Sequence, residues 1–167
     1  LYLCKVLCDY VIRMEKSISF VYKSLKLNEL NGVQLRLIDA CKSAVVGSYA
    51  PYSNFNVGAA VLLEDGTVVL GSNQENVAYP SGLCAERVAM FAANANYPDK
   101  APVALAISAW TDGAWRKDPI TPCGACRQVL SGTEQRFGKN IRLLLCGETK
   151  VIEVERVGDL LPLAFDF

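Results

Sequence analysis

The sequence of 167 residues contains no histidine. Histidine is the commonest protein metal ligand and the side chain that titrates closest to neutral pH. Any metal centre in this chain must therefore be built from cysteine and carboxylate groups, and any general base must be something other than an imidazole.

The chain also lacks an excess of charge of either sign. Lys+Arg and Asp+Glu both number 17, and no basic block interrupts the sequence. Duplex nucleic acid and anionic membranes are bound through clustered positive charge. We therefore expect neither nucleic acid nor a membrane as a partner, and the even charge counts against a nucleic-acid-editing enzyme.

A long uninterrupted apolar run is absent as well. Residues 1–13 are apolar but contain Lys5, Asp9 and Arg13. This stretch is too short and too interrupted to span a bilayer, and it lacks the longer apolar run and cleavage site of a signal peptide. We expect residues 1–13 to be dispensable and not part of the native protein, with Met14 as the true start.

Hydrophobic residues make up 51% of the chain and charged residues 20%, which is typical of one ordered domain. Strand patterns alternate with helix patterns, which favours an α/β fold, a three-layer α/β/α sandwich with a mixed central sheet of about five strands. We assign residues 1–30 to an N-terminal extension and 31–167 to the domain. A strand or ordered arm is expected at 17–27, helices at 33–48, 84–96 and 123–130 (the last ending near Gly132), and strands at 55–63, 67–70, 103–110, 141–146 and 151–156, with loops at 71–83 and 111–121.

Three of the seven cysteines have the spacing of metal ligands. Cys84 starts one predicted helix, and Cys123 and Cys126 lie in the first turn of another, where they share a face. Free N–H groups and the positive end of the helix dipole stabilise thiolates there. Three thiolates leave a fourth position of zinc open to water, as in catalytic rather than structural sites. The sequence therefore predicts a Zn²⁺ site with an open position.

Two charged residues follow the first ligand. Glu86 lies two residues after Cys84, close enough to a bound metal to move protons. Arg87 can donate hydrogen bonds to thiolate sulfur and so offset the net negative charge of a zinc ion bound by three thiolates. Alone, Glu86 would be a solvated helix-face carboxylate. Arg127 either plays the same part as Arg87 or is a surface or subunit-contact charge.

The main alternative is a structural zinc site completed by Cys146. Cys146 lies inside a predicted strand without a second ligand nearby, so we disfavour this alternative. Cys41 and Cys146 lie in apolar stretches and are expected to be buried free thiols. A disulfide framework is not expected, because zinc-binding thiolates suit a reducing compartment, and we expect a cytoplasmic location.

The chain resembles the homotetrameric, three-cysteine cytidine deaminases of nucleoside salvage over residues 33–165. Four motifs carry the resemblance: YAPYSNFNVGAAV, GSNQENVAY, CAER and PCGACRQVL. Zinc deaminases place a Glu two residues after the first ligand and a Pro-Cys-x-x-Cys downstream. The resemblance implies hydrolysis of cytidine and deoxycytidine to uridine and deoxyuridine with release of ammonia, and assembly as a homotetramer. Glu86 is then the proton shuttle.

The resemblance also implies the residues that bind substrate. Phe55 would pack on the pyrimidine, Asn73 and Glu75 would bind the ribose 3′-hydroxyl, and the main chain at Ala85 would contact the base. Tyr79 would reach a neighbouring subunit's site, and Phe165 would lie near a site. Without the resemblance these would be ordinary loop and strand residues.

Three rival functions differ in class or substrate. An enzyme acting on a cytosine-containing antibiotic such as blasticidin S is disfavoured by Asn73, Glu75 and the Arg that follows CAE. A catalytically silent, zinc-stabilised interaction protein is disfavoured by the intact Glu86. Deoxycytidylate and transfer-RNA deaminases usually have His as the first ligand, and this chain has none.

Overall fold

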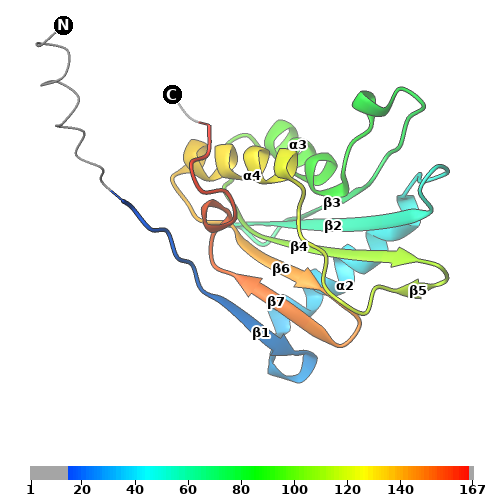
Figure 1. Cartoon of the computed structure of the whole chain (residues 1–167), viewed down its shortest axis with the longest axis horizontal. Coiled ribbons are helices and arrows are strands. Elements are labelled where there is room, and N and C mark those ends of the chain that lie inside the picture. The colour runs from blue at the N-terminus through cyan, green and yellow to red at the C-terminus, as the bar shows by residue number, and fades with distance from the viewer. Residues whose placement is uncertain (1–14, 166–167) are drawn as a thin grey trace, which may run out of the picture.

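The computed structural model describes residues 15–165, which form a seven-stranded mixed sheet (Figure 1). The strand order is β1-β7-β6-β4-β2-β3, and the short β5 pairs with β4. The strands are β1 (Tyr22–Lys26), β2 (Phe55–Leu63), β3 (Val68–Ser72), β4 (Pro102–Thr111), β5 (Ala114–Trp115), β6 (Arg142–Cys146) and β7 (Lys150–Val154). The α-helices are α2 (Gly32–Ala44), α3 (Ala85–Asn96) and α4 (Gly124–Phe137), with 3₁₀ turns η1 (Leu27–Glu29), η2 (Val45–Gly47), η3 (Tyr79–Ser81) and η4 (Val157–Leu160).

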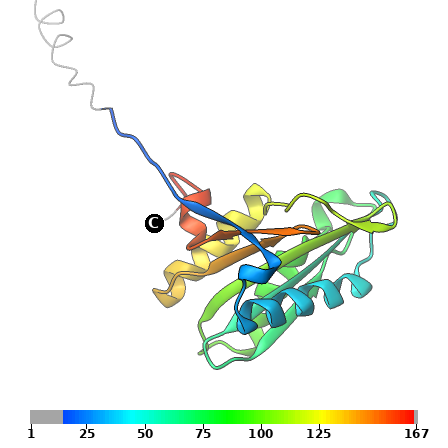
Figure 2. The same cartoon turned by 90° about the horizontal axis from the view of Figure 1, so that it is seen from below.

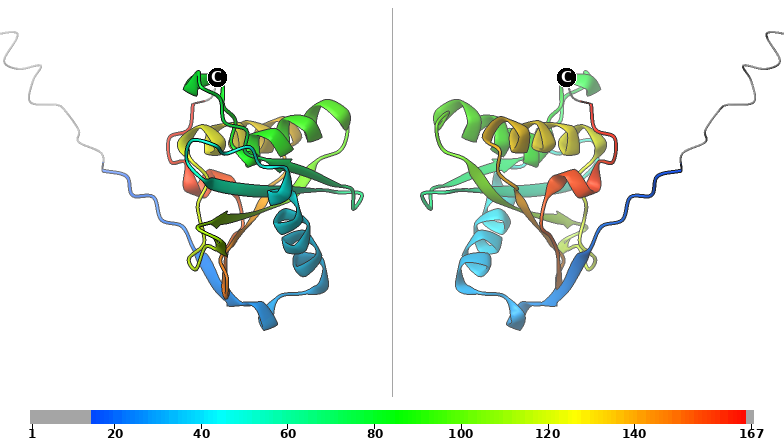
Figure 3. Two further views of the ribbon diagram at one scale, coloured as in Figure 1. Left: turned by 90° about the vertical axis from the view of Figure 1, so that its right-hand side faces the viewer. Right: turned by 90° about the vertical axis from the view of Figure 1, so that its left-hand side faces the viewer.

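The helices cover both faces of the sheet, which confirms the predicted three-layer α/β/α class. Helix α2 lies on one face, and α3 and α4 lie on the other (Figures 2 and 3). Because side chains alternate along a strand, β4 sends Leu105 and Ile107 into the core beneath α3 and α4, and Ala104 and Ala106 into the core beneath α2. The central strands are therefore apolar on both faces.

The pairing of β4 with β6 places α4. These two strands are parallel, whereas the other pairs in the sheet are antiparallel. A parallel pair needs a crossover connection, usually a helix, and α4 is that helix. Helix α4 begins beyond the end of β4. The end of β4 lies beside the start of β2 and near the end of β3, because Thr111 pairs with Phe55 and Ser72 pairs with Gly58. Helix α3 begins at the same edge of the sheet.

The predicted elements are present, but several bounds differ, and the sheet has seven strands where about five were predicted. The helix predicted at 33–48 ends at Ala44 and is followed by the 3₁₀ turn η2. Helix α4 was predicted to end near Gly132 but continues to Phe137 and ends at Gly138, which has a left-handed φ of 61°. Gly132 inside a helix costs about 1 kcal/mol, which the burial of Leu130, Ser131 and Thr133 on either side outweighs. The predicted loop at 111–121 contains β5, too short to show a periodic pattern.

The N-terminal arm is part of the sheet. Residues 22–26, within the predicted extension, form β1 and pair with the edge strand β7. The buried carboxylate of Glu153 accepts hydrogen bonds from Lys23 Nζ at 2.9 Å and from Gln34 Nε2 at 2.5 Å, which ties β1 and α2 to β7. The prediction for residues 1–13 lies outside the described residues. Among residues 15–165, none of the helices is both long and apolar enough to cross a membrane.

Helix α3 packs closely on β3 at Gly71. A Cβ atom built there would lie 2.4 Å from the Ala89 nitrogen and 2.6 Å from the Ala85 oxygen, distances that real Cβ atoms do not show. Only a glycine lets the helix backbone approach this strand. The start of α3, and with it Cys84 and Glu86, is therefore positioned partly by this contact.

We predict that Gly71→Ala lowers the free energy of unfolding by about 1–3 kcal/mol, because α3 must move away from β3. Gly132→Ala is the matched control, since a Cβ there would meet no atom within 4 Å. Alanine inside a helix is favoured over glycine by about 0.5–1 kcal/mol. Urea denaturation of the two variants measures both effects, and equal stability of the two would contradict the close approach at Gly71.

Candidate metal centre and active site

Two helix N-termini bring three cysteines together. Cys84 is the N-cap residue of α3, Cys123 is the N-cap residue of α4, and Cys126 lies in the first turn of α4. Neither N-cap sulfur accepts a hydrogen bond from the main chain of its own helix, so the sulfur atoms remain available to a ligand. The first N–H groups of both helices and their positive dipole ends favour negative charge at this point.

The spacing of the three sulfur atoms suits a zinc ion. All three lie within 4.8 Å of one another, and Cys84 Sγ and Cys123 Sγ are 3.8 Å apart. Tetrahedral zinc with Zn–S bonds of about 2.3 Å requires S–S distances of about 3.8 Å. Cys126 is buried, Cys84 half-buried and Cys123 exposed, so the cluster opens toward solvent on one side. The residues present therefore fit zinc bound by three thiolates with one open position.

The protonation of the cluster also points to a cation. Hydrogen bonds from the Cys126 thiol and from Arg87 lower the pKa of Cys84 to about 5. The same pairing with Cys84, together with burial, raises the pKa of Cys126. The cluster thus favours one thiolate and resists a second. Three thiolates at these distances become stable together only when a cation lies among them, which is how metal binding releases protons.

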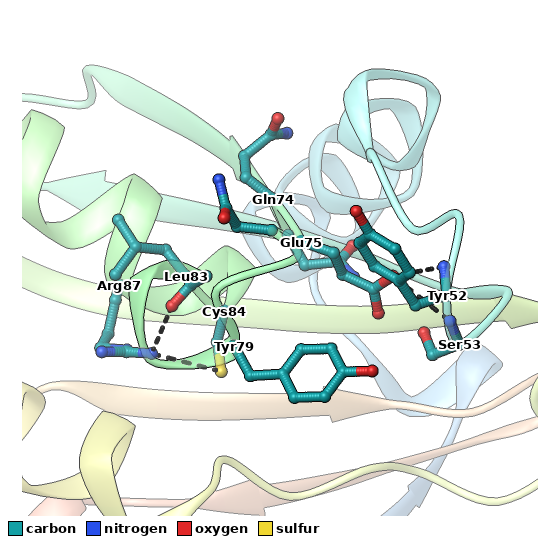
Figure 4. A pocket seen from close by; sticks show the side chains of 11 residues that line it. Tyr52, Ser53, Gln74, Glu75, Tyr79, Leu83, Cys84 and Arg87 are labelled. Atoms are coloured by element: carbon teal, nitrogen blue, oxygen red, sulfur yellow. Dashed lines mark hydrogen bonds between the residues drawn. The ribbon is translucent and has the colours of Figure 1, made fainter.

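Arg87 lies against the cluster. Its Nη2 is 3.9 Å from Cys84 Sγ and donates to the Gly82 carbonyl at 3.4 Å (Figure 4). Its Nε is buried and has no hydrogen-bond partner among the described residues. A buried donor without a partner is costly, whereas Nη2 is the nitrogen that faces the sulfur of Cys84.

Glu86 is the buried acid beside the sulfur atoms. It lies in the first turn of α3 and is 5% exposed. Burial, and after it the negative charge of Cys84, raises the pKa of Glu86 to about 7, while hydrogen bonds from its own backbone amide and from Cys126 partly oppose the rise. A carboxyl group whose pKa is near neutrality can both accept and give up a proton there.

A cavity of about 510 Å³ adjoins Cys84 and Arg87 (Figure 4). This volume is in the usual range of small-molecule sites. The predicted residues Asn73, Glu75 and Tyr79 line it. The cavity is also lined by residues that the sequence analysis did not assign: Tyr52, Ser53, Gln74, Asn76, Gly82 and Leu83.

Glu75 and Asn73 are held differently in this cavity. Glu75 Oε2 accepts from the Tyr52 amide at 2.9 Å and the Ser53 amide at 3.3 Å. Hydrogen bonds from Ser53 and Tyr52 hold the pKa of Glu75 below its usual range, so it is ionised at neutral pH. Asn73 Oδ1 accepts from Ser48 Oγ at 2.5 Å and the Val57 amide at 2.8 Å, and Asn73 Nδ2 donates to the Phe55 carbonyl at 2.8 Å. Asn73 therefore braces the start of β2 as well as lining the cavity.

The remaining predicted residues lie around the cavity or beneath it. Tyr79 is 77% exposed, and its ring meets that of Tyr52 edge-on at 6.1 Å. Phe55 is half-buried at the start of β2 and packs against the core beneath α3 and α4. Ala85 is fully buried as the first residue of α3. Neither Phe55 nor Ala85 lines the cavity within this chain.

Two alternatives from the sequence analysis are decided. Cys146 lies with Cys41 in the core beneath α2, on the face of the sheet opposite the cysteine cluster, so it does not complete a fourth ligand. Cys41 and Cys146 are buried free thiols, as predicted, and Cys4 and Cys8 lie outside the described residues. Arg127 donates to two main-chain carbonyls rather than to sulfur.

The sequence analysis missed Tyr52 and Ser53, whose main-chain amides bind Glu75. Backbone donors carry no signature in a sequence. Pro51-Tyr52-Ser53-Asn54 has the residue types of a turn, but Tyr52 and Ser53 lie 23 and 22 residues before Glu75 along the chain, and only the fold brings them within hydrogen-bond distance of it.

Comparison with known proteins agrees with this site. The family model described as the cytidine and deoxycytidylate deaminase zinc-binding region matches residues 33–137. A cytidine deaminase of Sporosarcina psychrophila is 42% identical over 130 residues, which are 78% of this chain and 89% of the relative. A cytidine deaminase of Mycobacterium tuberculosis is 40% identical over 125 residues, covering 73% of this chain and 81% of the relative.

Solved structures show the same fold. The crystal structure of cytidine deaminase from Burkholderia pseudomallei aligns with a TM-score of 0.66 at 41% identity, covering 78% of this chain and 98% of that one. The crystal structure of cytidine deaminase from Mycobacterium tuberculosis aligns with a TM-score of 0.61 at 36% identity and covers 80% of this chain and 97% of that one. Cys84, Cys123 and Cys126 all fall within the matched residues.

We predict that the purified protein contains one zinc per chain and that Cys126→Ser removes most of it, because two thiolates bind zinc more weakly than three. Cys146→Ser is the control, since it alters a thiol that is buried to the same extent but lies on the opposite face of the sheet. Metal analysis of both variants tests the site. Equal loss of zinc from both would show that Cys126 has no special part in binding.

Proposed function

This chain belongs to the cytidine and deoxycytidylate deaminase family, and we propose that it hydrolyses cytidine and deoxycytidine to uridine and deoxyuridine with release of ammonia. The observation that carries the proposal is the placement of Glu86. A buried carboxyl group lies beside three sulfur atoms with zinc-site spacing. A structural zinc site has no use for such a group, whereas a hydrolytic deaminase needs a proton carrier at that place.

Zinc held by Cys84, Cys123 and Cys126 supplies a Lewis acid that makes water a nucleophile at neutral pH. Glu86 does the proton work of the reaction. It takes one proton from the attacking water and gives it to ring nitrogen N3. It then takes the second proton from the hydroxyl added at C4 and gives it to the departing amine, which leaves as ammonia as the C4 carbonyl forms. Its burial beside the cluster suits these transfers, because desolvation raises the pKa of a carboxyl group toward neutrality, where it can both accept and give up a proton.

Arg87 balances the charge of the cluster. Three thiolates on a divalent ion leave a net charge of about −1, which would make a nearby water less acidic. The guanidinium against Cys84 Sγ withdraws part of that negative charge. The two helix N-termini act in the same direction.

The cavity favours a free nucleoside. Glu75 is ionised and fixed by two main-chain amides, so it accepts a hydrogen bond from a sugar hydroxyl and repels a phosphate at the same position. Asn73 lines the same wall and completes the ribose site. In this proposal Phe55 packs on the pyrimidine and the main chain at Ala85 contacts the base. Tyr79 reaches the site of a neighbouring subunit.

We propose a homotetramer with shared sites. Tyr79, which lines the cavity, is 77% exposed, and Phe165, held by Gln128 near the start of α4, is 71% exposed. Contact with further copies of the chain would bury these two large side chains. Light scattering tests the assembly, and an active monomer would contradict it.

Free thiols at all five described cysteines suit a reducing compartment, which favours the cytoplasm.

An ultraviolet assay with cytidine tests the proposal against its rivals. We expect cytidine and deoxycytidine to be turned over far faster than blasticidin S. No turnover of cytidine by protein that holds zinc would favour a silent, zinc-stabilised interaction protein instead. Preference for blasticidin S would favour the antibiotic-deaminase alternative.

We predict that Glu86→Gln keeps the fold and the zinc but lowers turnover of cytidine roughly 10²–10⁴-fold, the usual contribution of a general acid–base group. Glutamine has nearly the same shape but cannot carry the proton. Glu148→Gln, which changes a carboxylate in the turn between β6 and β7, is the control and should have wild-type turnover. Steady-state kinetics with parallel metal analysis gives both values, and a loss below about tenfold would remove Glu86 from the mechanism.

We predict that Glu75→Ala raises KM for cytidine strongly, because the site loses the acceptor of the sugar hydroxyl. The wild-type enzyme should turn over cytidine much faster than cytidine monophosphate or cytosine in single-stranded DNA. Kinetics on the three substrates measures this preference. Comparable rates on the monophosphate would overturn the assignment to free nucleosides.

A further inference from the structure

The C-terminal tail, residues 157–165, runs back along α4, the helix that begins at the metal ligand Cys123 (Figures 1 and 3). Three side chains of α4 hold this tail by its main chain. Glu134 accepts from the amides of Val157 at 2.9 Å and Gly158 at 3.1 Å. Because the bonds go to the main chain, they fix the path of the tail whatever its side chains are.

Farther along the tail, two more α4 side chains continue the clamp. Arg127 Nη1 donates to the Leu160 carbonyl at 2.9 Å. Gln128 Nε2 donates to the Phe165 carbonyl at 2.9 Å, and Gln128 Oε1 accepts from the Phe165 amide at 3.2 Å. Glu134, near the end of α4, thus holds the first residues of the tail, and Arg127 and Gln128, near the start of α4, hold its later residues.

Arg127 differs from the other two because it also holds the turn that carries Cys123. Its Nε donates to the carbonyl of the buried Pro122 at 2.9 Å. One half-buried guanidinium thus joins the residue before a metal ligand to the tail. The planar fork of arginine holds two acceptors in fixed directions, which the single ammonium of lysine does not do.

We propose that Arg127 is a positioning residue that couples the metal centre to the C-terminal tail. It touches neither the metal ligands' sulfur atoms nor the cavity, and it acts through the carbonyls of Pro122 and Leu160. Loss of the guanidinium leaves both carbonyls without this partner, so the turn at Cys123 and the tail loosen together. The inference rests on the proposed function only in taking zinc as the ion that the cysteines hold.

The chain offers two matched variants for the test. Arg136 lies on the same helix and donates to another proline carbonyl, that of Pro98, at 3.0 Å, away from both the cluster and the tail. Arg136→Gln therefore removes the same kind of bond at a point that holds neither the cysteine cluster nor the tail. Gln128→Ala removes only the attachment of Phe165 and leaves the Pro122 bond intact.

Two measurements on the zinc-loaded protein test the coupling: the rate of zinc release to a chromogenic chelator, and hydrogen–deuterium exchange of residues 157–165. For Arg127→Gln we expect zinc release to become roughly tenfold faster, as is usual when a residue that supports a metal ligand is lost, together with faster exchange in the tail. Gln128→Ala should speed exchange only, and Arg136→Gln should change neither. Should Arg127→Gln not fold, Arg127→Lys carries the same two readouts, because it keeps the charge and loses the fork.

Faster exchange of the tail with unchanged zinc release, or the reverse, would overturn the coupling. An equal effect of Arg136→Gln would also overturn it, because the change would then be a general effect on α4. Wild-type protein that binds no zinc would instead overturn the proposed function, so the two failures can be told apart.

Discussion

The mutual repulsion of three thiolates held within 4.8 Å of one another is the constraint on which this structure depends. Negative charge at such distances is stable only if opposite charge is provided nearby. The chain provides part of it through two helix N-termini and the Arg87 guanidinium, and a zinc ion supplies the rest. The same need explains why Cys84 and Cys123 take N-cap positions, where serine, threonine or aspartate would otherwise be favoured.

The fold meets this need through one topological choice. The parallel pairing of β4 with β6 requires the crossover helix α4, and the crossover starts at the edge of the sheet where α3 also starts. Close contact of α3 with β3 at Gly71 then helps to set the distance of Cys84 and Glu86 from the sheet. The site thus lies on the ends of packed helices, and loops contribute mainly the cavity wall at Glu75 and Tyr79. Catalytic groups on packed elements are held more precisely than groups on loops.

Much of this arrangement could be predicted from the sequence. The cysteine spacing predicted the three residues that the structure brings together, and the apolar run at 55–63 predicted β2 with its observed bounds, because both depend on local patterns. The end of α4 was wrong, because tertiary packing of Leu130 and Thr133 outweighed the helix-breaking tendency of Gly132. The amides that bind Glu75, and the two carbonyls that bind Arg127, could not be predicted, because main-chain partners leave no mark in the residue types.

The most direct test of this account is X-ray absorption at the zinc edge of the purified protein. Three sulfur ligands at about 2.3 Å and one lighter ligand are predicted, because Cys84, Cys123 and Cys126 supply three thiolates and leave one position open. Four sulfur ligands would show a closed structural site and would contradict the central claim.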